Sequence, residues 1–278
     1  MPGALTRLDG RVAVVTGAGR GVGRATACLL AGEGARVVVN DLDGGEADAT
    51  VQIIRDAGGQ ALACPGDVTA AAFPQLLVQT AVDAFDELDI LVNNAGYIWN
   101  GAMHNHSDEQ WQAMLDVHAT APFRILRAFA PWLKQRVARE IAEHGVARCR
   151  KVVNVSSVSG TRGAATQVAY ATAKAAVTGL TKTLAKEWGR YNVCVNCVAF
   201  GHIETRLTQP YQHEPPRINV AGRDHRVGLT EAQLEGVRQA TPLGRAGRPE
   251  DGAGAIYLFC IPQSDYITGE VLTCSGGA

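Results

Sequence analysis

The stretch Thr16-Gly17-Ala18-Gly19-Arg20-Gly21-Val22-Gly23 stands between the β-branched run Val12 to Val15 and the helical segment ATACLLAGEG. Glycines at a strand-to-helix turn let the backbone approach a pyrophosphate closely, and the first N–H groups of the helix point at it. A glycine turn can also close a tightly packed β-α unit that binds nothing. Its place between a strand and a helix favours a dinucleotide site.

Short β-branched runs recur along the chain and alternate with longer Ala- and Leu-rich segments of helical spacing. The later runs are Arg36 to Val39, Asp89 to Val92, Val152 to Val155 and Val193 to Val198. This alternation predicts right-handed βαβ crossovers and a parallel sheet covered on both faces. No Pro- or Gly-rich linker divides the chain before residue 200, so we predict a doubly wound α/β fold in a single domain over residues 1–278.

Two stretches look like additions to a minimal sheet. Residues 134–151 carry six basic side chains beside Glu140 and Glu143, which suits a helix extended into solvent. Residues 204–240 contain Pro210, Pro215 and Pro216 and are too irregular for one element. Long irregular insertions in compact domains are often lids or binding loops.

The composition excludes several classes of protein. Over 278 residues, 46% are hydrophobic and 19% charged, which argues against disorder. A balance of 26 Lys and Arg against 27 Asp and Glu disfavours nucleic acid as a partner. No apolar run approaches the roughly 18 residues of a membrane span, and the first residues lack a signal-peptide core, so we expect a cytoplasmic protein without a membrane partner.

The seven cysteines are an odd number in a chain too large to need disulfides, so we expect reduced thiols. Cys194 and Cys197 have C-x-x-C spacing, but they lie in a predicted strand, where residues three apart point to opposite faces. The histidines are scattered along the chain. The sequence therefore predicts no metal site.

Asp41 ends the run RVVVN, 24 positions after Gly17. A carboxylate there accepts hydrogen bonds from the adenosine ribose hydroxyls and repels a 2′-phosphate, which favours NAD over NADP. Arg20 argues the other way, since a guanidinium can pair with that phosphate. Because a dianion beside an aspartate is repelled at close range while Arg20 can swing into water, NAD is the predicted cofactor.

Tyr170 and Lys174 lie four residues apart in YATAK, on one face of a predicted helix. A phenol with a pKa near 10 is a poor base at neutral pH, but a neighbouring ammonium and an oxidised nicotinamide both favour the phenolate. On spacing alone such a pair occurs on many surface helices. If a dinucleotide binds nearby, the two side chains can act on the same substrate atom.

Taken together, these features resemble the short-chain dehydrogenase/reductase family over nearly the whole chain, in particular its 3-oxoacyl-(acyl-carrier-protein) reductases and 3-hydroxyacyl-CoA dehydrogenases. The matching segments are Thr16 to Gly23, Gly66-Asp67-Val68, Asn93-Asn94-Ala95-Gly96, Asn154 to Gly160, Tyr170 to Lys174, Pro242 to Arg245, Pro249-Glu250, Thr268-Gly269 and Gly276-Gly277. The resemblance implies a Rossmann fold with a mostly seven-stranded parallel sheet, a small substrate lid at 204–240 after the sixth strand, and a homotetramer.

The resemblance also implies roles for individual residues. Tyr170 is the expected general acid/base, Ser157 holds the substrate oxygen, and Lys174 binds the nicotinamide ribose and tunes Tyr170. His118 stands where the family usually has an Asn that completes a proton relay; an imidazole can pass protons, and a structural His bonded to a backbone carbonyl is the equal alternative. The predicted cofactor contacts are Gly17, Arg20, Gly21, Val22, Gly23, Asp41, Asp67, Val68, Asn94, Ala95, Gly96, Tyr170, Lys174, Gly201, Ile203 and Thr205.

The predicted reaction is reversible hydride transfer between a nicotinamide and a secondary alcohol or ketone, without a metal. A 3-oxoacyl or 3-hydroxyacyl thioester is the expected substrate, and steroids, polyols and terpenoid alcohols remain open. The residues expected to edge the substrate pocket are Tyr97, Ile98, Trp99, His202, Glu204 and Arg206. A dinucleotide-binding sensor without turnover is the alternative of another class, although a sensor has no chemical use for Ser157, Tyr170 and Lys174.

Overall fold

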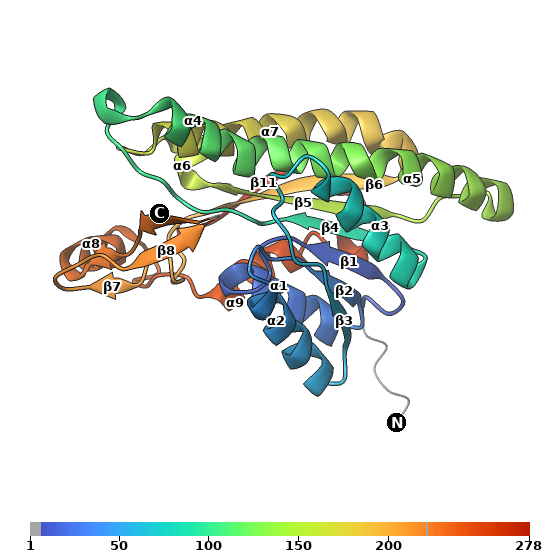
Figure 1. Ribbon diagram of the computed structural model, residues 1–278. Helices are drawn as coiled ribbons and strands as arrows, with labels where there is room; N and C mark the ends of the chain where they lie inside the picture. Colours follow the sequence, from blue (N-terminus) through green and yellow to red (C-terminus); the bar gives the residue numbers. More distant parts are fainter. Residues whose placement is uncertain (1–6, 221) are drawn as a thin grey trace.

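The computed structural model describes residues 7–220 and 222–278 and shows three layers, with a central sheet between two layers of helices (Figure 1). Seven parallel strands form the sheet in the order β11-β6-β5-β4-β1-β2-β3. Their bounds are β1 (Val12–Val15), β2 (Arg36–Val39), β3 (Gln60–Ala63), β4 (Ile90–Asn93), β5 (Arg150–Ser157), β6 (Val193–Phe200) and β11 (Val271–Cys274). The predicted doubly wound parallel sheet is confirmed.

Helices cover both faces of this sheet (Figure 1). One face carries α1 (Gly21–Gly32), α2 (Gly44–Asp56) and α9 (Pro249–Tyr257). The other carries α3 (Phe73–Phe85), α4 (Asp108–Leu115), α5 (Ala121–His144), the short α6 (Val158–Arg162) and α7 (Val168–Trp188). The pleat of β1 shows why its sequence is apolar throughout: Val12 and Val14 join the core on one side, and Ala13 and Val15 join the core on the other.

The order of the strands reverses beside β1, which pairs with β2 on one side and with β4 on the other. The chain leaves β1 into α1 on one face and leaves β4 towards α4 and α5 on the opposite face. The connections therefore diverge at the carboxyl ends of these two strands. In open parallel sheets this divergence creates the crevice in which ligands bind.

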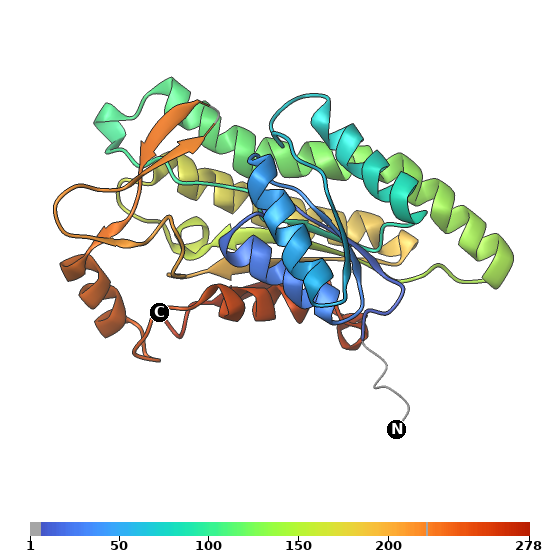
Figure 2. The ribbon, with the colours of Figure 1, turned by 60° about the horizontal axis from the view of Figure 1, so that its bottom comes forward.

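Residues 204–240 form two small sheets and a helix beyond the carboxyl end of β6. The elements are β7 (Pro210–Tyr211), β8 (Arg217–Val220), β9 (Arg223–Arg226), β10 (Leu229–Thr230) and α8 (Glu231–Ala240). Figure 2 shows the antiparallel β8–β9 hairpin beside α4, where Arg223 forms an ion pair with Glu109. The buried His225 ring contacts Tyr97 and Trp99 at centroid distances of 4.9 and 4.6 Å. Among residues 7–220 and 222–278, no helix combines the length and apolarity needed to cross a bilayer.

The basic stretch 134–151 is only partly the solvent-exposed helix that its charges predict. The helix ends at His144, and Arg150 and Lys151 begin the buried strand β5, so this prediction is wrong for its last residues. Arg150 is 0% exposed and donates hydrogen bonds to Glu87 and Glu140 at 2.8 and 2.7 Å. Two carboxylates from distant elements compensate the buried guanidinium, and local sequence does not reveal this pairing.

We expect Arg150→Met to lower the free energy of unfolding by about 3 kcal/mol or more, because it removes the fully buried cation from Glu87 and Glu140 and leaves only the partly buried Arg136 to pair with them. Urea unfolding followed by circular dichroism measures the change. Arg139→Met is the matched control, since Arg139 is exposed on the same helix as Glu140. A loss below about 1 kcal/mol for Arg150→Met would show that this ion-pair cluster contributes little.

Candidate active site

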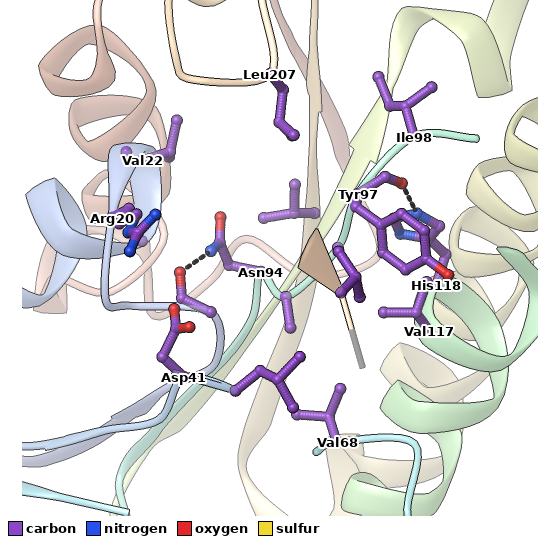
Figure 3. Close-up of a pocket in the computed structure, with 18 of the residues that line it drawn as sticks. Arg20, Val22, Asp41, Val68, Asn94, Tyr97, Ile98, Val117, His118 and Leu207 are labelled. Carbon is purple, nitrogen blue, oxygen red and sulfur yellow. Dashed lines mark hydrogen bonds between the residues drawn. The ribbon is translucent and has the colours of Figure 1, made fainter. Parts of the chain in front are cut away.

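A cavity of about 790 Å³ opens at the carboxyl ends of β1, β4 and β5 (Figure 3). Figure 3 shows Arg20, Val22 and Asp41 on one side of it and Tyr97, Val117 and His118 on the other. The predicted site residues that line it are Gly17, Arg20, Gly21, Val22, Gly23, Asp41, Asp67, Val68, Asn94, Ala95, Gly96, His118, Ser157, Tyr170, Lys174, Gly201 and Thr205.

Ile203 is the predicted cofactor contact that does not line the cavity. Its side chain is buried in the core beside Gly247, with which it forms an isolated bridge. Of the expected substrate-pocket residues, Tyr97, Ile98 and Arg206 line the cavity, whereas Trp99, His202 and Glu204 do not. Asn219 and Val220 also reach the cavity, from the β8–β9 hairpin, and neither residue was predicted to line it. Gly222, two residues after β8, was the only local sign of a turn there.

The glycine turn makes a backbone cradle of the size and polarity that a diphosphate needs. Gly17 has a φ of +60°, and a Cβ there would lie 2.7 Å from Ala95 Cα. A Cβ on Gly23 would lie 2.1 Å from the carbonyl oxygen of Gly17. The residue before α1, Arg20, provides no side-chain cap, so the first N–H groups of the helix are free to bind an anion. These residues fit a dinucleotide.

Three carboxylates, Asp41, Asp43 and Glu46, lie at the end of the cavity where the adenosine is expected to bind. Asp41 accepts the backbone N–H of Gly19 at 2.9 Å and that of Asp43 at 3.1 Å. The Arg20 guanidinium lies 2.7 Å from Glu46 and 3.2 Å from Asp43, and these partners raise its pKa. Arg20 is therefore already engaged by two carboxylates.

The catalytic end is built from β5 and the first turns of α7. Ser157 ends β5, and its Oγ accepts the backbone N–H of Ser159 at 3.1 Å. Lys174 Nζ donates a hydrogen bond to the carbonyl oxygen of Val155 at 2.7 Å and lies 5.8 Å from the ring centre of Tyr170. Ser157, Tyr170 and Lys174 thus meet at one wall of the cavity.

Burial governs the protonation of these groups. It raises the pKa of Tyr170 to about 12, against the opposing effect of its hydrogen bond with Ser157, and it lowers the pKa of Lys174 to about 8. We expected Lys174 to lower the pKa of Tyr170. In the structure desolvation is the larger effect on the pKa of Tyr170 and the hydrogen bond with Ser157 is the smaller one, so Tyr170 is a protonated phenol at neutral pH.

His118 lies in a π-helical turn, Asp116–Thr120, between α4 and α5. It is 3% exposed, and its Nε2 donates to the carbonyl oxygen of Tyr97 at 2.7 Å. Its ring meets that of Tyr170 edge-on at 5.0 Å. Burial and then the charge of Lys174 hold its pKa well below the usual range, so the imidazole is neutral. Nδ1 is buried and has no hydrogen-bond partner among the described residues.

Comparisons with known proteins agree with this geometry. The family model for short chain dehydrogenases matches residues 11–216. The chain is 37% identical over 276 residues to a 3-oxoacyl-[acyl-carrier-protein] reductase of Synechocystis sp., with 98% of each chain covered. It is 38% identical over 266 residues to the short-chain reductase protein NovJ of Streptomyces niveus, with 96% and 93% covered.

A solved structure of a 7α-hydroxysteroid dehydrogenase, complexed with NADH and 7-oxo glycochenodeoxycholic acid, superimposes with a TM-score of 0.83. It is 28% identical, and the match covers 99% of this chain and 96% of that one. The family and this NADH complex indicate a nicotinamide dinucleotide as cofactor. The fold, the arrangement of the cavity and these matches show that the chain belongs to the short-chain dehydrogenase/reductase family of oxidoreductases.

Proposed function

We propose that the protein is an NAD(H)-dependent oxidoreductase that interconverts a 3-oxoacyl thioester and its 3-hydroxyacyl counterpart, with Tyr170 as the acid/base. One observation carries the proposal: a single cavity joins the Ser157, Tyr170 and Lys174 wall to the glycine turn and Asp41. The chemistry and the cofactor cradle therefore share one space. A dinucleotide sensor without turnover would need the cofactor cradle but would not need Ser157, Tyr170 and Lys174.

The bound nicotinamide supplies a hydride in the direction of reduction and accepts one in the direction of oxidation. Ser157 donates a hydrogen bond to the substrate carbonyl oxygen, and Tyr170 delivers its phenolic proton to the same oxygen. Because burial keeps Tyr170 protonated, the free site is prepared for reduction. Lys174, 5.8 Å from the phenol ring, stabilises the phenolate that forms and binds the nicotinamide ribose.

The apolar residues of the cavity lining favour an apolar chain on the carbonyl substrate. They include Tyr97, Ile98, Val117, Leu207 and Val220. An acyl chain suits such walls, and the Synechocystis relative is named for a 3-oxoacyl thioester. The insertion 204–240 contributes Leu207 and Val220 to the cavity, and we propose that it acts as the substrate lid.

Tyr170→Phe should lower the rate of NADH-dependent reduction of acetoacetyl-CoA by roughly 10²- to 10⁴-fold, because the proton donor is lost. The affinity for NADH should fall far less than the rate, because only the phenolic hydroxyl is removed, and fluorescence titration checks this. Tyr191→Phe, at the far end of α7, is the matched control. Full activity of Tyr170→Phe would remove Tyr170 from the mechanism. Turnover of 7-oxo bile acids, polyols or terpenoid alcohols without any turnover of thioesters would overturn only the substrate assignment.

The arrangement around Asp41 supports NAD rather than NADP. A 2′-phosphate placed beside the Asp41 carboxylate would be repelled, and the Arg20 guanidinium is held by Glu46 and Asp43. Freeing Arg20 for the phosphate would break both ion pairs. The repulsion by Asp41 therefore favours NAD.

We therefore expect the dissociation constant of NADPH to exceed that of NADH by roughly tenfold or more, as measured by titration of the purified protein. Asp41→Asn should narrow this ratio, because it removes the charge while keeping the shape of the side chain. Asp48→Asn, on the exposed face of α2, changes the net charge equally and should leave the ratio unaltered. Tighter binding of NADPH than of NADH to the wild-type protein would contradict the assignment of NAD.

We also propose that His118 relays protons between the cavity and Tyr170 through Nδ1, which accepts a proton and then releases it, while Nε2 keeps its hydrogen bond to the Tyr97 carbonyl. Because Nε2 donates to the Tyr97 carbonyl, Nδ1 carries the lone pair and is an acceptor. This buried acceptor lies on a ring that contacts Tyr170 and is close enough to Lys174 for that ammonium to lower its pKa. The carbonyl bond fixes the ring, and the free nitrogen is available for proton exchange.

His118→Leu should lower kcat for reduction by roughly tenfold or more while leaving the affinity for NADH unchanged, since it removes the acceptor nitrogen. His118→Asn should restore part of kcat, because its amide can both donate and accept. The pH profile of kcat distinguishes a relay from packing, since only loss of a relay changes its shape. Equal kcat and pH profile for the wild type and His118→Leu would leave His118 with a structural role.

A further inference from the structure

Three cationic side chains line the cavity among the described residues, namely Arg20, Lys174 and Arg206. Arg20 is paired with Glu46 and Asp43, and Lys174 donates to the carbonyl oxygen of Val155. Arg206 makes no hydrogen bond or ion pair with any residue in the described part of the chain. It is therefore the one of the three that is free to receive an anion.

The segment that carries Arg206 runs across the glycine turn. Thr205 Cγ2 lies 3.3 Å from the place where a Cβ on Gly21 would stand, so the segment passes directly over the start of α1. The turn is fixed locally, because Thr205 Oγ1 accepts the backbone N–H of Leu207 at 3.2 Å. Figure 3 shows Leu207 pointing into the cavity above Asn94.

Three carboxylates attract Arg206, but none of them forms an ion pair with it. Burial lowers its pKa, and the nearby Arg20 lowers it further, while the attraction of Asp41, Glu46 and Asp43 is weaker. These three carboxylates are engaged with Arg20, with Arg24 or with backbone N–H groups. Arg206 is exposed and lies next to another cation, so its guanidinium gains from the approach of an anion.

We propose that Arg206 binds the diphosphate of the dinucleotide and closes the cradle on the side opposite the N-terminus of α1. The backbone N–H groups of α1 then hold one side of the diphosphate, and a guanidinium from the insertion holds the other. Since Arg206 belongs to the insertion 204–240, bound cofactor fastens the start of this segment over the cavity. The inference rests on the dinucleotide site of the proposed function, and it does not depend on the substrate.

The test is the dissociation constants of NADH, NADPH and ADP-ribose for the wild type and Arg206→Met, from fluorescence and calorimetric titrations. All three ligands contain the diphosphate, ADP-ribose lacks the nicotinamide, and NADPH alone carries a 2′-phosphate. We expect Arg206→Met to weaken all three by a similar factor, roughly tenfold or more, with partial recovery in Arg206→Lys. Arg226→Met, an exposed position of β9 outside the cavity lining, is the control and should change none of them.

Unchanged constants for Arg206→Met would overturn the inference. Weakened binding of NADPH alone would also overturn it, because Arg206 would then contact the 2′-phosphate. Failure of the wild-type protein to bind any of the three ligands would instead contradict the dinucleotide site itself, so the two failures are distinguishable. Circular dichroism of each variant confirms that the fold is retained.

Discussion

Hydrogen bonds between the carboxyl ends of β1 and β4 position both ends of the cavity. Thr16 Oγ1 accepts the backbone N–H groups of Asn94 and Ala95, each at 3.0 Å. In return, Asn94 Nδ2 donates to the carbonyl oxygens of Thr16 and Gly17 at 2.9 and 3.1 Å. These bonds extend the pairing of the two strands beyond the ladder, which ends at Val15 and Val92. The glycine turn and the chain that leads to Tyr97 are therefore held as one unit at the place where the connections diverge.

Within this frame, burial sets the charge of each catalytic group. Desolvation favours the neutral form of every group, so it keeps the proton on Tyr170, removes the charge from His118 and weakens the hold of Lys174 on its proton. The result is a proton donor, Tyr170, with a neutral acceptor, His118, and a readily titrated ammonium, Lys174, at 5.0 and 5.8 Å from its ring centre. If Tyr170, His118 and Lys174 were exposed, their pKa values would not be shifted in this way, because water would stabilise the charged forms.

The sequence predicts what depends on neighbours along the chain. The strands Val12–Val15 and Arg36–Val39 match their predicted bounds, because strands buried on both faces are apolar throughout. The glycine turn and the Tyr170–Lys174 pair are also local patterns. In contrast, Arg150 can be buried because Glu87, 63 positions away, accepts its hydrogen bond. The sequence around Arg150 shows only a run of positive charge.

The same limit applies to the candidate site. Motifs place Ser157, Tyr170 and Lys174 at the cavity, because each motif fixes a residue at the end of a strand or on one face of a helix. Asn219 and Val220 reach the cavity on a hairpin that is held by contacts of His225 with Tyr97 and Trp99, more than a hundred residues away, and by the ion pair between Arg223 and Glu109. Tertiary packing of this kind leaves no periodic signal in the sequence.

Tyr97 connects the insertion with the catalytic end of the cavity. The short turn after β4, residues 94–97, therefore makes three kinds of contact. Asn94 secures the glycine turn; Gly96 leaves room for His118, whose ring would lie 2.2 Å from a Cβ at that position. The Tyr97 carbonyl fixes the imidazole at 2.7 Å, and its ring supports His225 of the hairpin at 4.9 Å. A shift of the hairpin therefore removes packing from the residue that orients His118. Four consecutive residues therefore contact the cradle, the imidazole and the insertion, so a change in this turn acts on all three.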